Sequence, residues 1–157
     1  MSVEKGELEI SFDDGETTSF VPLQLHFHSP SEHTIDGKHY DLEMHIVHKY
    51  KDSGDLGAVV GIFFDTIVGG PTNNQFIAEI APELARDQKL SDNNSNGNGQ
   101  YEVDDGVRFA QFLRSVDFRD FYQYDGSLTT PPCTEGIRWL VVKDVQSLSP
   151  AQLEAFQ

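Results

Sequence analysis

The chain has 157 residues, of which 38% are hydrophobic and 11% aromatic. This length and composition fit a single folded domain with a hydrophobic core and argue against general disorder. The 26 acidic residues outnumber the 11 basic ones and give a formal net charge of −15. Such a surface repels the phosphates of nucleic acids and of anionic membranes, so we expect neither as a partner. No apolar run is long enough to cross a bilayer, so we do not expect membrane insertion either.

Apolar and polar residues alternate through much of the first half of the chain, as in β-strands that bury one face. The alternation predicts strands over residues 8–12, 21–28 and 40–50. A fourth run, residues 58–64, is almost continuously apolar and predicts a strand buried on both faces. Asp36-Gly37 lies between the second and third runs and suits a tight reversal. Connections this short favour an antiparallel sheet over β-α-β units.

One polar loop and two helices are predicted in the rest of the chain. Residues 91–100 contain no apolar side chain and predict a flexible surface loop. Apolar spacing predicts a helix over residues 107–116, with Asp104-Asp105 as cap residues. A final helix is predicted to begin at Ser149-Pro150, with Gln152 completing a capping box. The expected fold is mainly β: a single twisted, largely antiparallel sheet with a few short peripheral helices.

Three histidines on two neighbouring predicted strands give the strongest chemical signal. Side chains alternate across a strand, so His26 and His28 point to the same face. The predicted reversal brings the next strand alongside, where His45 can supply a third imidazole on that face. Three neutral imidazoles leave one position of a tetrahedral zinc ion open, which is typical of a catalytic site. Zinc is favoured over copper or iron by geometry and availability, so the identity of the metal is an inference.

Two histidines in an alternating strand are also compatible with a solvated face, and their neighbours help to decide. Gln24 precedes His26 by two residues and Glu43 precedes His45 by two, so both lie on the face of the histidines. There they can accept or orient the free ring N–H of a ligand. A buried carboxylate such as Glu43 would be costly without such a partner. The sequence therefore predicts His26, His28 and His45 as metal ligands, with Gln24 and Glu43 behind them.

The remaining histidines are predicted to have structural roles. His33 and His48 are expected to be buried, hydrogen-bonded core residues, and His39, just past the predicted turn, is expected to be exposed. The segment Gly126–Gly136 contains two prolines that fix φ and is bounded by glycines. By these properties alone it is a rigid loop.

Three segments of the chain resemble blocks of the alpha carbonic anhydrases. They are Gln24–Thr34 (QLHFHSPSEHT), Leu42–His48 (LEMHIVH) and Gly126–Gly136 (GSLTTPPCTEG). They occur in the family's order, and the resemblance covers nearly the whole chain from about Glu7 onward. The Ser-Pro-Ser-Glu-His and Pro-Pro-Cys variants are similar to those of the bacterial, plant and protist branch. Residues 1–157 thus resemble one partial alpha carbonic anhydrase domain.

The resemblance implies zinc-dependent, reversible hydration of carbon dioxide to bicarbonate and a proton. It assigns zinc to the three histidines already named. Thr129 would accept the proton of the hydroxide on zinc and be oriented by Glu32, and its backbone N–H would contact a bicarbonate oxygen. Thr130 would lie at the polar side of the substrate pocket. The apolar wall that receives carbon dioxide would consist of Val47, Val59, Leu128 and Trp139.

The chain also departs from the family pattern, so we expect either a fragment or a sheet that another chain completes. No Gln-Ser-Pro block precedes His26, and no histidine lies there to act as the proton shuttle. Family members continue past Trp139 through more of the core sheet. An alternative function is therefore a weakly active or inactive accessory or structural subunit that keeps the fold.

The single cysteine gives an expectation about cellular location. In the bacterial and plant branch, the cysteine that corresponds to Cys133 pairs with an N-terminal cysteine, and this chain has no second one. Cys133 is interpreted either as a small buried residue or, from the resemblance, as a half-cystine without its partner. The second interpretation predicts a parent protein that is secreted, periplasmic or in an organelle lumen.

Overall fold

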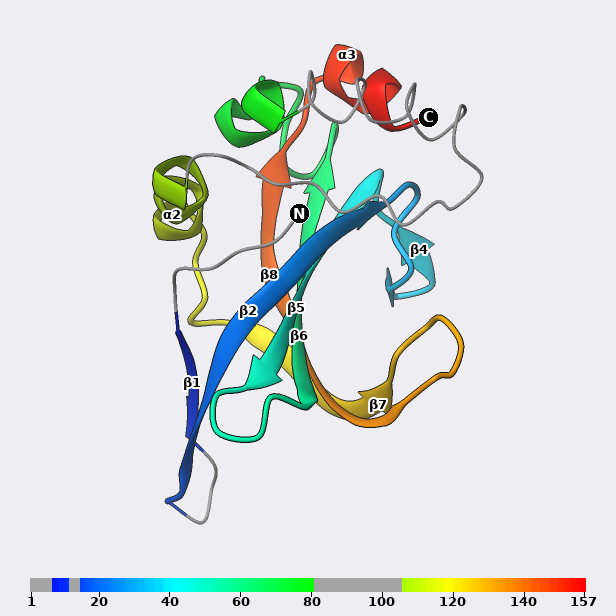
Figure 1. Cartoon of the computed structure of the whole chain (residues 1–157). Coiled ribbons are helices and arrows are strands. Elements are labelled where there is room, and N and C mark those ends of the chain that lie inside the picture. The colour runs from blue at the N-terminus through cyan, green and yellow to red at the C-terminus, as the bar shows by residue number, and fades with distance from the viewer. Residues whose placement is uncertain (1–6, 12–14, 81–105) are drawn as a thin grey trace, which may run out of the picture.

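A six-stranded sheet forms the main body of the protein, in the order β1-β2-β5-β6-β8-β7 (Figure 1). The computed structural model describes residues 7–11, 15–80 and 106–157, without the side chains of residues 106–108. The strands of the sheet are β1 (Leu8–Ser11), β2 (Thr17–His28), β5 (Leu42–Tyr50), β6 (Leu56–Asp65), β7 (Phe121–Ser127) and β8 (Glu135–Ser147). A small hairpin adds β3 (Thr34–Ile35) and β4 (Lys38–His39). The predicted mainly β fold is confirmed.

All neighbouring strands of the sheet are antiparallel except β6 and β8, which run parallel. The prediction of a largely antiparallel sheet is therefore confirmed, and the parallel pair is an addition to it. The four predicted strands correspond to β1, β2, β5 and β6, but β2 begins at Thr17 rather than Val21. The strands β7 and β8 were not predicted, although buried Ile137, Trp139 and Val141 alternate along β8.

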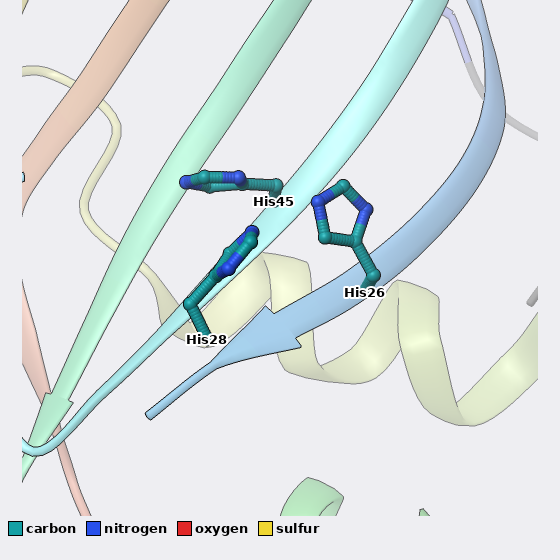
Figure 2. Close-up of side chains that lie close together, drawn as sticks. All are labelled: His26, His28 and His45. Atoms are coloured by element: carbon teal, nitrogen blue, oxygen red, sulfur yellow. The ribbon is translucent and has the colours of Figure 1, made fainter. Parts of the chain in front are cut away.

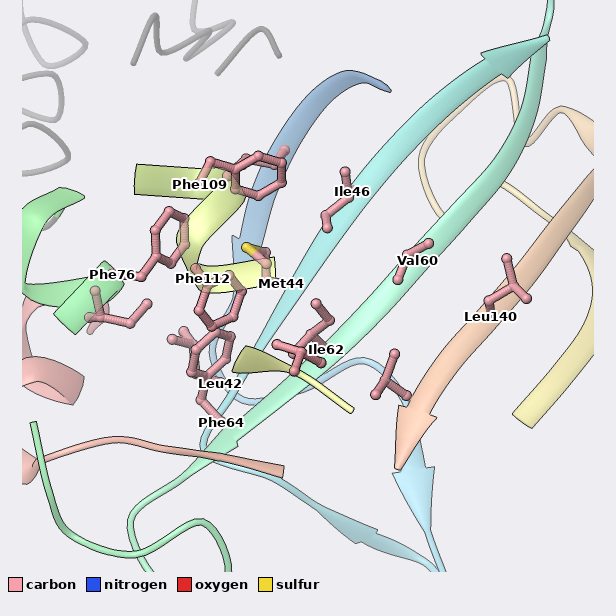
Figure 3. Packing of buried hydrophobic residues seen from close by; sticks show 14 of the residues in the cluster. Leu42, Met44, Ile46, Val60, Ile62, Phe64, Phe76, Phe109, Phe112 and Leu140 are labelled. Carbon is pink, nitrogen blue, oxygen red and sulfur yellow. The ribbon is translucent and has the colours of Figure 1, made fainter. Parts of the chain in front are cut away.

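The large hydrophobic core lies on one face of the sheet, beneath α2 (Gly106–Ser115) and a helix at residues 75–80 (Figure 3). On β5, the alternating side chains of Leu42, Met44 and Ile46 enter this core. The intervening residues, Glu43, His45 and Val47, therefore project from the opposite face. That opposite face carries the histidines discussed below.

The two predicted helices are present, whereas the helix at residues 75–80 was not predicted. The helix α2 matches the prediction for 107–116 to within one residue, whereas Asp104-Asp105 and the predicted loop at 91–100 lie outside the described residues. The helix α3 (Pro150–Leu153) continues into the 3₁₀ helix η1 (Glu154–Phe156), and the capping box of Ser149 and Gln152 is present. No helix in the described parts of the chain is long and apolar enough to cross a membrane.

The buried histidine of β5 predicts a dependence of stability on pH. His48 is buried, its Nδ1 lies 2.8 Å from the Ile46 carbonyl oxygen, and burial lowers its pKa to about 4. The unfolded chain takes up this proton below about pH 6.5. The contribution of neutral His48 to stability is thus present above that pH and is lost as the pH falls toward 4.

Urea unfolding between pH 4 and 7 tests this effect, with His48→Gln as the comparison. We expect the unfolding free energy of the unsubstituted chain to fall by roughly 3 kcal/mol more than that of the variant over this range. Parallel pH profiles for the two proteins would show that His48 is not the group responsible.

Candidate metal centre

The pairing of β2 with β5 places the predicted ligands opposite one another. His26 faces His45 across the two strands, and His28 faces Glu43. Residues directly opposite in an antiparallel pair project to the same face, so the three imidazoles meet. Asp36 and Gly37 form the turn of the β3–β4 hairpin between these strands, with positive φ at both positions. That conformation explains why an Asp-Gly pair occupies this turn.

The three imidazoles form a compact group (Figure 2). One ring nitrogen of each lies within 4.8 Å of the others, and the ring centroids are 4.6 to 5.2 Å apart. His45 is 1% exposed, whereas His26 and His28 are half-buried. The geometry fits a site that is closed from beneath and open toward solvent.

The contacts of the rings indicate which nitrogens are free for a metal. The Nδ1 of His26 lies 3.0 Å from Gln24 Oε1 and can donate its proton there, which leaves Nε2 free. The Nε2 of His28 is buried and has no hydrogen-bond partner among the described residues. The Nε2 of His45 lies 2.9 Å from Glu43 Oε1. The contact is close, but an N–H on this nitrogen would not point at the oxygen well enough to form a hydrogen bond. The carboxylate nevertheless favours the proton on that nitrogen and leaves Nδ1 of His45 free.

Electrostatics keep two of these rings neutral. Burial, together with the neighbouring His45 and His28, lowers the pKa of His26 to about 4. The pKa of His28 is also lowered, first by burial and then by His45. Neutral imidazoles at physiological pH offer the lone pairs that zinc requires. The donor set therefore fits a zinc ion.

The carboxylate behind His45 is completely buried. Glu43 is 0% exposed and accepts hydrogen bonds from His33 Nδ1 at 2.6 Å and from the His33 backbone N–H at 3.0 Å. Burial acts to raise the pKa of Glu43, but the interactions with His33 and His45 outweigh it and hold the pKa well below its usual range. Glu43 is therefore an anion at neutral pH.

The structure corrects the expectation for His33 in part. The residue is hydrogen-bonded, as predicted, but it is half-buried and belongs to the network around Glu43 rather than to the core. A buried carboxylate needs more than one hydrogen-bond donor. The predicted burial of Glu43 could therefore have indicated His33 as a further donor to it. His48 is buried and hydrogen-bonded and His39 is exposed, as expected.

A second group of potential ligands shares one histidine with the first. His33, Glu43 and His45 also lie within 4.8 Å of one another through one atom each. The oxygens of Glu43 are already occupied by the two hydrogen bonds from His33. The first group is the better candidate because its ring nitrogens are free.

Two polar residues that the resemblance assigned to catalysis lie beside the imidazoles. The Thr129 hydroxyl, in the loop between β7 and β8, donates to Glu32 Oε2 at 2.9 Å. The same carboxylate oxygen lies 3.6 Å from His28 Nε2 and 4.0 Å from His45 Nδ1. The pair therefore adjoins the ligands from the side of the β7–β8 loop.

The residues that the resemblance assigned to an apolar wall lie together in the structure. Val47, Val59 and Trp139 face one another across β5, β6 and β8. They form one hydrophobic cluster that Leu128 joins, and two unpredicted residues, Leu56 and Ile137, belong to it as well. The rings of Trp139 and His45 are 4.8 Å apart, so the cluster borders the histidines. Thr130 is exposed in the same loop.

The cysteine of the loop is at the surface. Cys133 is exposed and unpaired, so its interpretation as a small buried residue is wrong. Its pairing with a second cysteine in a longer parent protein stays a prediction.

Comparison with known proteins agrees with this geometry. The family profile described as eukaryotic-type carbonic anhydrase matches residues 1–157. The chain belongs to this family. A carbonic anhydrase from Nostoc sp. is 41% identical over 138 residues, which are 87% of this chain and 46% of that protein. The resemblance stated from the sequence is thereby confirmed.

Solved structures of carbonic anhydrases and of a related protein share the fold. The Photobacterium profundum alpha-carbonic anhydrase superposes with a TM-score of 0.70 at 36% identity, covering 98% of this chain and 61% of that one. A dioscorin complexed with ascorbate gives a TM-score of 0.65 at 30% identity, covering 96% and 56%. The chain thus spans about half the length of the curated relatives it matches and somewhat more of the solved ones.

Proposed function

We propose that the chain is the zinc-binding catalytic part of an alpha carbonic anhydrase and catalyses reversible hydration of carbon dioxide to bicarbonate and a proton. The observation that carries the proposal is the position of the Thr129–Glu32 pair beside three imidazoles with free nitrogens. Zinc would be held by His26 Nε2, His28 Nε2 and His45 Nδ1. Bound zinc would supply a Lewis acid that lowers the pKa of a water molecule to about 7, a magnitude known from carbonic anhydrases themselves.

The role of Thr129 follows from the direction of its hydrogen bond. Its hydroxyl proton is donated to Glu32, so the hydroxyl oxygen can only accept toward the metal side. An accepting oxygen at that point binds only a nucleophile that still carries an O–H. The hydrogen bond from this O–H then fixes the direction of the nucleophile's lone pair. Thr129 therefore acts by orientation, and Glu32 acts through Thr129.

The apolar cluster suits a nonpolar substrate. Carbon dioxide has no hydrogen-bond donor, and a wall of Val47, Val59, Leu128 and Trp139 holds it by exclusion of water rather than by polar contacts. Thr130 provides the polar side of the pocket, where the charged product can be released.

Proton release is the step that this sequence supports least. The remaining histidines of the 157-residue chain, His33, His39 and His48, are committed to hydrogen bonds with Glu43, Ser31 and Ile46. We therefore expect turnover to depend on added buffer, which can carry the proton in place of an internal shuttle.

A second candidate is a weakly active or inactive relative that retains the fold. The chain spans 46% of the length of the Nostoc carbonic anhydrase, and this alternative holds if that part alone does not suffice for catalysis. Under this alternative the zinc ligands would be present, but hydration would not exceed the background rate.

Stopped-flow hydration of carbon dioxide by the zinc-loaded chain separates the two candidates. We expect a rate above that of the His45→Ala variant, a rise with buffer concentration and inhibition by a sulfonamide. His39→Ala, which removes an exposed histidine from the neighbouring hairpin, is the matched control and should retain the rate. A zinc-loaded chain that is no faster than His45→Ala would favour the inactive relative.

A further inference from the structure

The buried serine beside Glu32 has all of its polar atoms engaged. Ser31 is 2% exposed, and its hydroxyl donates to the His33 carbonyl oxygen at 2.6 Å and accepts from the Tyr40 backbone N–H at 2.9 Å. Its backbone N–H donates to the Tyr40 carbonyl oxygen at 3.0 Å, and its own carbonyl oxygen lies 2.6 Å from Nδ1 of His39. Water can replace the exposed His39, so the contacts of the hydroxyl are the ones that the protein alone supplies.

The hydroxyl lies where the regular pairing of the β3–β4 hairpin ends. The last pair of the hairpin is Thr34 with His39, so a regular ladder would continue to His33 and Tyr40. The Ser31 hydroxyl joins these two residues, because it accepts the N–H of one and donates its own proton to the carbonyl oxygen of the other. The chain departs from the strand at this point, as at a β-bulge, and such departures change the direction of a side chain.

The side chain at this departure is that of Glu32. The residue lies between Ser31 and His33, and the bond from the Ser31 hydroxyl to the His33 carbonyl oxygen closes a small ring around its backbone. The Glu32 side chain is 34% exposed, and its carboxylate accepts from the Thr129 hydroxyl at 2.9 Å. Because so much of the side chain is open to solvent, the direction of the carboxylate depends on the backbone that carries it.

We propose that Ser31 is a positioning residue for the Thr129–Glu32 pair. Its hydroxyl fixes the backbone of Glu32, and with it the carboxylate that holds the Thr129 hydroxyl in its accepting orientation. This inference rests on the proposed function and extends it to a residue that touches neither metal nor substrate.

Removal of the Ser31 hydroxyl leaves two backbone groups without their partner. In Ser31→Ala, the Tyr40 N–H and the His33 carbonyl oxygen each lose the bond to the hydroxyl. A buried polar group without a partner is costly, so the backbone around Glu32 shifts to find new partners. A displacement of about 1 Å at a group that orients a reactant can cost about 100-fold in rate. The zinc ligands lie on β2 and β5, outside this ring, and should keep the metal.

The test compares Ser31→Ala with Ser149→Ala in the zinc-loaded 157-residue chain. Ser149 is also buried, and its hydroxyl accepts from the Gln152 backbone N–H at 3.3 Å as the cap of α3. Helix α3 packs through Leu153 on the large core, on the face of the sheet opposite the histidines. We expect kcat/KM for carbon dioxide hydration to fall about 10-fold in Ser31→Ala and to stay unchanged in Ser149→Ala, with one zinc per chain in both.

The carboxyl carbon of Glu32 gives a readout that needs neither zinc nor activity. Its NMR chemical shift reports the hydrogen bond from Thr129, so Thr129→Ala should move this shift in the otherwise unsubstituted chain. Ser31→Ala should move it in the same direction, and Ser149→Ala should leave it in place. In a Ser31→Ala background, Thr129→Ala should add little to the change in the shift, because the bond is already lost. Full additivity of the two substitutions would overturn the proposal.

A second variant covers the case in which Ser31→Ala does not fold. Ser31→Cys fills a similar space, but a thiol is only a weak donor and acceptor. It should lower kcat/KM and move the Glu32 shift in the same direction as Ser31→Ala, by smaller amounts. A cysteine variant with the rate and the chemical shift of the unsubstituted chain would show that the hydroxyl has no positioning role.

The outcome for the proposed function can be distinguished from the outcome for Ser31. A zinc-loaded chain no faster than His45→Ala, in which Ser31→Ala still moves the Glu32 shift, would contradict only the catalytic function. An active chain in which Ser31→Ala and Ser149→Ala behave alike would contradict only the role of Ser31. An inactive chain in which the two variants also leave the shift unchanged would contradict both.

Discussion

Replacement of His45 by alanine is expected to abolish stoichiometric zinc binding. The change removes one of three ligands and takes from Glu43, which is completely buried, one of the groups that offset its charge. A buried carboxylate left with fewer partners also costs about 1–3 kcal/mol of stability. Metal analysis of protein prepared without added zinc measures the occupancy directly.

The control for this prediction is another histidine of the same chain. His39→Ala should keep one zinc per chain, because His39 is exposed and contacts the Ser31 carbonyl oxygen rather than the metal group. Full zinc occupancy in His45→Ala would show that the proposed ligand set is wrong.

Replacement of Thr129 by alanine is expected to lower kcat/KM for carbon dioxide hydration on the order of 100-fold. The variant loses the hydroxyl that Glu32 holds in an accepting orientation, while all three zinc ligands remain. Zinc content should therefore be unchanged, which separates this effect from that of His45→Ala. Stopped-flow hydration with matched zinc loading is the measurement.

Thr129→Ser is the matched variant because it keeps the hydroxyl and its bond to Glu32. We expect it to recover most of the activity that Thr129→Ala loses. If alanine at position 129 changed the rate by less than about threefold, orientation by the Thr129–Glu32 pair would not be part of the mechanism.

The sequence predicted the part of the site that depends on local periodicity. The two-residue spacing of His26 and His28 assigns them to one face in any strand, and the same rule holds for Glu43 and His45. The Asp36-Gly37 turn and the capping box at Ser149 are equally local, since each depends on residues within three positions. These features were therefore predictable without any knowledge of distant contacts.

The parts that the sequence did not predict depend on contacts between distant segments. The exposed aromatic residues Tyr122 and Tyr124 give β7 no clear alternation between a buried and an exposed face. The contact of His33 with Tyr124 spans 91 positions, so no local pattern indicates it. Thr129 and Glu32, which are 97 positions apart, were assigned through the family resemblance, because the loop by its residues alone was only a rigid turn.

Some predictions stay untested by the structure. The loop at 91–100 lies outside the described residues. Completion of the sheet by another chain and the location of the parent protein also stay predictions, because they concern partners and compartments rather than the geometry of this chain.

Anomalous diffraction at the zinc edge, from crystals of the zinc-loaded chain, tests the central claim most directly. We predict one peak at about 2.0–2.1 Å from His26 Nε2, His28 Nε2 and His45 Nδ1. The competing group of His33, Glu43 and His45 makes the measurement decisive, since it shares only His45 with the predicted site. A zinc peak bound by His33 and Glu43, or zinc bound elsewhere with no peak between the three predicted histidines, would contradict the proposed metal centre.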